Sequence, residues 1–283
     1  MSYGFFAAGN AGNLIIGDDN PVLRRAYSGE LRITQVERQQ WPAAYKAMYA
    51  FCAVTYPSPI GTVAPPLVFG SPNGAVSGAG LCAFMPLGSA GNWTGFRVVC
   101  KAPGAERLLH VGESTGWTYH ACVHEPENFT PGRGFGLRLF NVAKNIIFDS
   151  SWAIVPFRSL LTNWSLASTV GRMYDGKFRG DWGNRNYNQQ TNNDYVRQYY
   201  THAWGASDGT LGVLISSLSG WEITGDAGFS RAVRFVLPPT IFFSGSDRTK
   251  IHCLVDAGIW QHPTIDRQAM NRFSLLTGDI SRL

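Results

Sequence analysis

The string GESTG at positions 112–116 is the stretch of this chain whose spacing comes closest to a catalytic motif. It matches the GxSxG pattern, in which a sharp turn between a strand and a helix presents a serine hydroxyl to a histidine. The residues on either side, 110–111 and 116–123, are typical of strands, and no helical periodicity follows. The string therefore predicts a β-turn between two strands and not a nucleophilic serine.

Two further residues, His120 and His124, have the side chains that a metal ion would need. They share one face of a strand, and imidazole is a common metal ligand. A site also needs a third ligand, and the sequence identifies none among the other histidines. We therefore predict neither a metal site nor a cofactor, while metal binding by this pair stays an open alternative.

Acidic residues form no recognisable catalytic pair. The two carboxylates that hydrolyse a glycosidic bond meet only in the folded protein, so their spacing along the chain is uninformative. The Asp and Glu residues here fall mostly in predicted loops, where solvated side chains are the ordinary case. We expect the chain to be non-enzymatic.

Aromatic side chains gather in the polar segment 173–204, interleaved with Asn, Gln and Arg. Tyr, Trp and Arg dominate protein interfaces, and exposed aromatic rings also stack on sugar rings. The segment therefore predicts either a subunit interface or a glycan-binding surface, and the sequence does not separate the two. The candidate binding residues are Tyr174, Phe178, Arg179, Trp182, Arg185 and Tyr187.

Composition indicates that these side chains are positioned by strands. Of 283 residues, 15% are charged and 13% are aromatic, with 32 Gly and 15 Pro, which favours a turn-rich all-β protein. No run of about 18 apolar residues occurs, and the first residues do not resemble a secretion signal. We expect no membrane insertion, and synthesis and folding in a cytoplasm.

The charge distribution and the cysteine spacing exclude some classes of partner and of structural site. The net charge of +5 comes from basic and acidic residues that are interspersed, without the Lys/Arg cluster of a nucleic-acid protein. The 5 cysteines include no CxxC pair and are odd in number, which fits neither a zinc ribbon nor a disulfide framework. We expect no nucleic-acid partner and buried, reduced thiols.

An internal repeat organises the chain. Segments 3–20 and 135–152 align without a gap at an offset of 132 residues, with Gly4 on Gly136 and Asn13 on Asn145. Each copy reads as a β-hairpin, because its aromatic strand is followed by a turn with Asn and then by a β-branched or aromatic run. Each hairpin is therefore predicted to open one domain.

The predicted fold is all-β, with two tandem β-sandwich-like domains at residues 1–128 and 129–283. The boundary falls in the Pro- and Gly-rich segment 125–134, and short strands recur about every ten residues on both sides of it. The second domain carries the polar insertion at 173–204. One short helix is expected, around 266–276.

The repeated segment resembles the start of small β-rich tail-tip and tail-fibre proteins of tailed bacteriophages. The residues that carry the resemblance are Tyr3, Gly4, Asn10, Gly12, Asn13, Ile15, Ile16 and Asp18, and again Phe135, Gly136, Asn141, Asn145, Ile146, Phe148, Asp149 and Ser150. The resemblance covers about the first 155 residues and implies a structural role in the virion. It carries no catalytic residue across.

The expected function is therefore a structural component of a phage tail tip or fibre. We expect it to assemble with copies of itself, as a trimer by resemblance, and with other tail proteins, and to contact the host surface. The alternative is a module that recognises, or cleaves, a host-surface carbohydrate through the 173–204 segment.

Overall fold

The computed structural model describes a largely β-structured chain. The described residues are 4–9, 12–17, 22–37, 49–73, 79–101, 109–124, 136–140, 144, 146–170, 172–174, 177–179, 193–204, 210–218, 234–236, 240–244, 247–260 and 273–281. Their regular structure consists of antiparallel strands and one 3-10 turn, η1 (Ile215–Ser217), which confirms the all-β prediction. None of these residues belongs to a helix that is long and apolar enough to cross a membrane.

One sheet has six strands, all antiparallel to their neighbours. In spatial order they are β12 (Phe157–Leu161), β21 (Leu275–Asp279), β17 (Leu211–Leu214), β6 (Leu67–Pro72), β9 (Ser114–Val123) and β3 (Arg24–Arg32). The strands β12 and β3 are therefore the two edges of this sheet.

The second sheet is larger and curves across the first. Its order is β13 (Ser165–Val170), β16 (Asn193–Ala203), β20 (Asp247–Trp260), β19 (Thr240–Ser244), β7 (Gly80–Ser89), β8 (Asn92–Lys101), β5 (Tyr49–Ile60) and β4 (Gln35–Glu37), with β18 (Arg234–Val236) also paired to β20. Strands β13 and β4 lie at its two edges.

The two sheets pack face to face over one hydrophobic core. Trp117 of β9 is fully buried and contacts Phe243 of β19, with ring centroids 5.0 Å apart. Tyr119 of β9 meets Phe96 of β8 edge-on at 5.2 Å. Alternate residues of β9 point into this core because successive side chains of a strand face opposite sides. The architecture is a β-sandwich.

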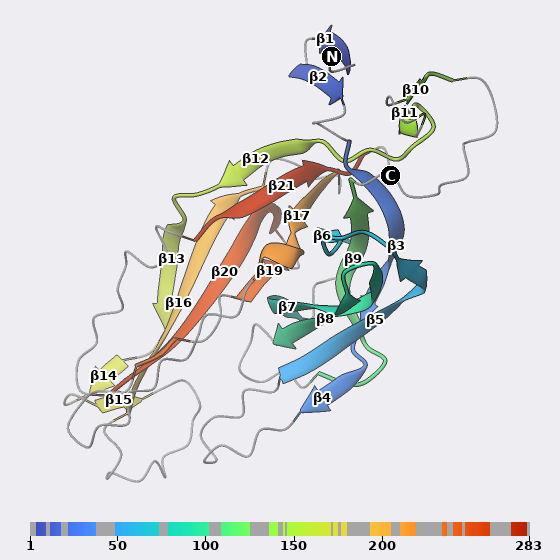
Figure 1. Ribbon diagram of the computed structural model, residues 1–283. Helices are drawn as coiled ribbons and strands as arrows, with labels where there is room; N and C mark the ends of the chain where they lie inside the picture. The colour runs from blue at the N-terminus through green and yellow to red at the C-terminus, as the bar shows by residue number, and fades with distance from the viewer. Residues whose placement is uncertain are drawn as a thin grey trace.

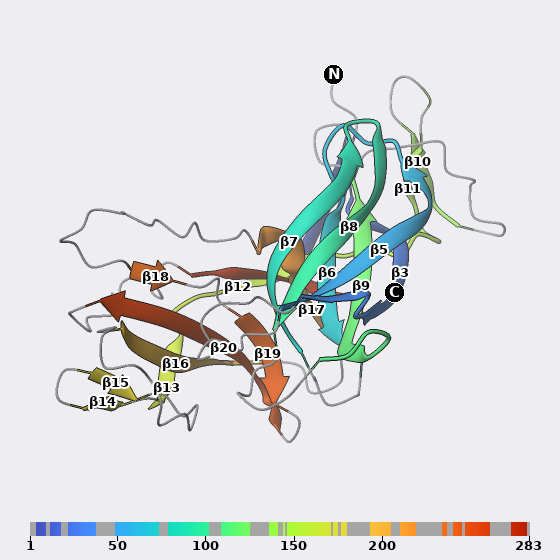
Figure 2. The same cartoon turned by 90° about the horizontal axis from the view of Figure 1, so that it is seen from below.

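The predicted division into domains at 1–128 and 129–283 is not confirmed, because both sheets run through the boundary. In the six-stranded sheet Gly70 of β6 pairs with Val213 of β17, and in the larger sheet Leu81 of β7 pairs with Ile241 of β19. Within these two sheets, strands of the first half gather on one side and strands of the second half on the other (Figures 1 and 2). Each half thus supplies part of both sheets, and the halves join edge to edge.

Both copies of the repeat form hairpins, as predicted. Strand β1 (Gly4–Gly9) pairs with β2 (Gly12–Gly17), and β10 (Arg138–Phe140) pairs with β11 (Ile146–Asp149). Each is a separate two-stranded sheet at the same end of the sandwich, and β11 comes close to β2 (Figure 1). The predicted boundary segment 125–134 lies outside the described residues.

The two hairpins differ in register. At the offset of 132 residues, Arg138 is the equivalent of Phe6. Arg138 pairs with Asp149, the equivalent of Gly17. Phe6 instead pairs with Ile15. The repeat therefore specifies a hairpin in each half without specifying the same pairing.

The last strand corrects one sequence prediction. A helix is expected around 266–276, but Leu275 and Leu276 begin β21, and residues 266–272 lie outside the described part of the chain. Leu275 packs in the main core and Leu276 contacts the smaller cluster on the opposite face of the sheet. This alternation is that of a strand, and burial on both faces outweighs the helical propensity of leucine.

Candidate functional site

The GESTG string lies at a turn that leads into a strand, as predicted, but residues 110–111 before it belong to no strand, so the predicted strand on that side is wrong there. The amide of Glu113 donates to the carbonyl of His110, and Gly112 has a φ of +85°, which glycine adopts readily. Ser114 is the first residue of β9. It does not lie on a strand-to-helix turn, so the geometry of a nucleophile elbow is absent at this string.

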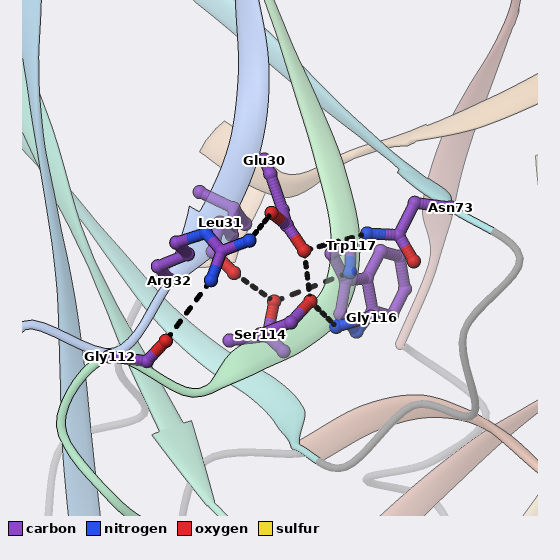
Figure 3. Close-up of polar contacts among 9 residues, drawn as sticks. Glu30, Leu31, Arg32, Asn73, Gly112, Ser114, Gly116 and Trp117 are labelled. Atoms are coloured by element: carbon purple, nitrogen blue, oxygen red, sulfur yellow. Dashed lines mark hydrogen bonds and ion pairs between the residues drawn. The ribbon is translucent and has the colours of Figure 1, made fainter.

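Ser114 belongs to a network of polar side chains on the outer face of the six-stranded sheet (Figure 3). Its hydroxyl donates a short hydrogen bond to Oε1 of Glu30. The same carboxylate pairs with Nη2 of Arg32 at 2.5 Å and accepts from Nδ2 of Asn73 at 3.3 Å. Nη1 of Arg32 also donates to the carbonyl of Gly112 at 3.2 Å. Three separate segments therefore converge on one carboxylate.

Register places more polar residues on this face. Cross-strand partners share a face of the sheet, and Thr118 lies opposite Glu30 while His120 lies opposite Ser28. We call the six partly or fully exposed residues of this surface the polar strip. They are Ser28, Glu30, Arg32, Asn73, Ser114 and Thr118.

The strip keeps a carboxylate charged. The hydrogen bond from Ser114, followed by the charge of Arg32, lowers the pKa of Glu30 below its ordinary value. A carboxylate held in this way is a weak base, so it does not turn the Ser114 hydroxyl into a stronger nucleophile. What the arrangement can do is accept and donate hydrogen bonds from fixed positions.

Beside the strip, His120 is buried in an uncharged state. Its Nε2 lies 3.2 Å from the hydroxyl of Ser71, and its Nδ1 has no hydrogen-bond partner among the described residues. Burial, with the nearby charge of Arg25, lowers the pKa of His120 to about 4. The imidazole therefore stays neutral until the solution is strongly acidic.

The described residues offer no third ligand for a metal at this histidine. Among the described residues, no group of three or more His, Cys, Asp or Glu side chains could hold an ion. His124 lies just beyond the end of β9 and is exposed, whereas His120 is buried within the strand. The burial of the two side chains thus differs, although their spacing suggested a common site.

The cysteines are buried, as predicted. All five are free thiols on strands, and burial raises the pKa of Cys82 and of Cys122 to about 12. The sulfurs of Cys52 and Cys100 lie 3.4 Å apart inside the core. Thiols of this kind are held protonated and are poorly reactive.

The predicted binding residues of the 173–204 segment are only partly described. Tyr174 ends β14 (Arg172–Tyr174), and Phe178 and Arg179 lie in β15 (Lys177–Arg179), with which β14 forms a hairpin at the far end of β16. The remaining three residues, Trp182, Arg185 and Tyr187, lie outside the described part of the chain. Both alternatives for this segment, a subunit interface and a glycan-binding surface, stay predictions.

Three aromatic residues, one before this segment and two at its end, belong to the core. Trp164, Tyr200 and Trp204 are all buried, and the indole nitrogen of Trp164 donates to the carbonyl of Phe273 at 3.1 Å. Their sequence context is polar, so composition does not mark them as core residues. Alternation within 193–203, which forms the strand β16, could have identified Tyr200.

A second surface feature is apolar and escaped the sequence analysis. The edge strand β12 exposes Phe157 and Leu160 by 52% and 55%, and the next strand, β13, exposes Leu166 by 43%. β12 and β13 are consecutive in sequence, yet β12 is the edge of one sheet and β13 the edge of the other. Together they form one open side of the sandwich, which we call the apolar edge.

Comparison of the chain with protein-family models, with curated proteins and with solved structures finds no match. The assignment of a function therefore has to come from the sequence and from the two surfaces described above.

Proposed function

We propose that this chain is a non-enzymatic structural component of a tailed-phage virion, located at the tail tip or in a tail fibre. The resemblance of its two opening segments to such proteins supports the proposal, and both segments fold as hairpins. A β-sandwich hosts many functions, so the fold alone does not carry the assignment. The apolar edge carries it.

The apolar edge has the properties of an assembly surface. No other described strand pairs with the outer side of β12, so its backbone groups on that side are open to a further strand. The ring of Phe157 lies 6.2 Å from that of buried Phe69, which makes the exposed surface an extension of a packed cluster. Apolar side chains on an open edge favour association with another protein surface.

The partners that this role implies are copies of the same chain and neighbouring tail proteins. A trimer follows from the resemblance, since a cyclic assembly could bring the edge of each copy against its neighbour. The role includes contact with the host surface, and it requires neither nucleic acid nor insertion into a membrane.

Light scattering on the purified full chain tests the proposal. We expect the wild-type protein to have the mass of an oligomer. Leu160→Asp places a charge at the centre of the apolar edge and should reduce the mass to that of a monomer, while thermal melting shows the variant still folded. A wild-type monomer would contradict the proposal.

The matched control is Met85→Asp. Met85 lies on β7 in the other sheet and is exposed by 50%, close to the exposure of Leu160. Its substitution should leave the mass of the oligomer unchanged. Equal loss of assembly in both variants would mean that the added charge, and not the position, disrupts the oligomer, and the assembly role of the apolar edge would then be wrong.

A further inference from the structure

The outer face of the six-stranded sheet is divided into an apolar part and a polar part. The apolar part is covered, because Phe69 and Cys122 are packed beneath Val155 and Ile280 in a small cluster. The polar strip lies on the same face, beside β3, and its six residues are half-buried or exposed. The covered part of the face includes the buried polar pair of Ser71 and His120, and the polar strip lies beyond it.

The charged groups of the polar strip are held in place before any ligand arrives. Glu30 is fixed by three donors, and Arg32 by Glu30 and the carbonyl of Gly112 (Figure 3). Ordering a flexible side chain on binding costs about 0.5–1.5 kcal/mol, and that ordering has already occurred here. The strip therefore presents a pre-organised acceptor beside a pre-organised donor.

Both groups retain hydrogen-bonding capacity toward solvent. A carboxylate has about four lone-pair positions and a guanidinium has five N–H donors. Three donors reach Glu30 among the described residues, and Arg32 uses two of its terminal nitrogens. Their side chains are exposed by 31% and 59%, so the remaining positions are accessible to a ligand.

An acceptor next to a donor matches a pair of neighbouring hydroxyl groups. One hydroxyl of such a pair can donate to the Glu30 carboxylate while the next accepts from the Arg32 guanidinium. The hydroxyls of Ser28 and Thr118 continue the strip, with successive rows about 7 Å apart along the strands. A row of this kind suits a ligand that carries hydroxyls along its length.

The geometry points to a saccharide-binding site on the polar strip, in which Glu30 and Arg32 contact two adjacent sugar hydroxyls. The site is separate from the 173–204 segment and does not depend on the proposed assembly role. The described part of the strip has no exposed aromatic ring for a sugar to stack on, so affinity at one site is expected to be weak. Several copies on one particle would raise the overall affinity through multivalency.

Saturation-transfer difference NMR with defined monosaccharides tests the inference, because it detects weak binding to a protein of 31.0 kDa or more. The probes are D-glucose, D-galactose, L-rhamnose and N-acetyl-D-glucosamine, each titrated against the full chain. We expect transfer to at least one probe, with a dissociation constant on the order of 1–10 mM, as about two charge-assisted hydrogen bonds would give. Absence of transfer to all four would overturn the inference.

Variants locate the binding. Glu30→Gln should raise the dissociation constant of the probe at least fivefold, since the amide is uncharged and accepts fewer hydrogen bonds. Ser28→Phe blocks the strip from an exposed position without removing any contact of the network, and should also abolish the signal, which covers the case that Glu30→Gln unfolds the turn.

The matched control is Arg158→Gln. Arg158 is exposed by 54%, close to the exposure of Arg32, and lies on β12 at the opposite edge of the same sheet. It should leave the signal unchanged. Equal binding by wild type and by both strip variants would place the sugar elsewhere and overturn the inference, whatever the oligomeric mass proves to be.

Discussion

The two edges of the six-stranded sheet are stabilised in different ways. At β3 the side chains of Glu30 and Arg32 bond to one another and to the turn before β9. At β12 the exposed residues are Phe157 and Leu160, and the ion pair of Arg158 with Asp279 spans a loose 3.8 Å. Charged groups on an edge discourage pairing with another chain, whereas apolar groups favour it. This difference agrees with the proposal that a partner covers β12 while β3 remains in solvent.

The largest effect that we expect is a pH dependence of stability that arises beside the polar strip on β3. The folded protein lowers the pKa of His120 from 6.5 to about 4, because burial disfavours the charged ring. Its contribution to stability is therefore complete above pH 6.5 and is lost as the pH falls from about 6.5 to about 4, a total of up to about 3 kcal/mol.

Urea unfolding at several pH values measures this loss. His120→Gln removes the titrating group, so the free energy of unfolding of the variant should fall less between pH 6.5 and 4 than that of the wild type. Identical pH dependence in the two proteins would mean that His120 is protonated without difficulty in the folded state, contrary to its burial.

Side-chain packing should be the main contribution to stability at the apolar edge. A Cβ atom on Gly278, which pairs with Phe157, would lie 2.8 Å from both the Phe69 ring and a methyl group of Val155. Gly278→Ala is therefore expected to destabilise the protein by about 2 kcal/mol through overpacking. Thermal and urea unfolding check the value, with Ser28→Ala on β3 as the control, which should change stability by no more than about 0.5 kcal/mol.

Hydrogen bonding should be the main contribution to stability at the polar strip. Ser114→Ala removes the first contributor to the lowered pKa of Glu30, so that pKa should rise toward 4.5 and stability should fall by about 1 kcal/mol. Because the folded pKa is lowered, the contribution of Glu30 is present above pH 4.5 and declines in acid. An NMR titration of the Glu30 carboxyl carbon measures the pKa, and an unchanged value would contradict the network.

The smallest effect is expected from the ion pair at the apolar edge. Arg158 and Asp279 are both partly exposed at 3.8 Å, where solvent screens the attraction. Arg158→Gln should therefore change the free energy of unfolding by less than about 0.5 kcal/mol. A larger loss would mean that this edge, like the other, depends on polar contacts, and the contrast between the edges would disappear.

Much of the strand pattern was predictable from the sequence. The alternation in 116–124 and 251–259 and the Gly/Pro turns between strands indicate β9 and β20 without a structure. The hairpin of each repeat copy was predictable for the same reason, because turn residues and β-branched runs act locally. The register of each hairpin was not, since it depends on packing outside the repeat.

The candidate surfaces were much less predictable. Ser114 drew attention as a possible nucleophile, but its partner Glu30 is 84 residues earlier, and nothing in either segment marks the other. Phe157 and Leu160 fall in a segment that reads as an ordinary strand. Their exposure follows from the position of β12 at the edge of the sheet. The order of strands in a sheet cannot be predicted from local sequence patterns.

Local patterns in the sequence are enough to predict that this chain is all-β, where most strands and turns fall, and that its two halves begin with similar hairpins. These properties follow from side-chain period, turn chemistry and propensity within a few residues. That the halves share both sheets is visible only in the fold, through the pairing of β6 with β17 and of β7 with β19. Such pairing depends on contacts between residues more than 100 positions apart, and the same placement of strands decided which edge is polar and which is apolar.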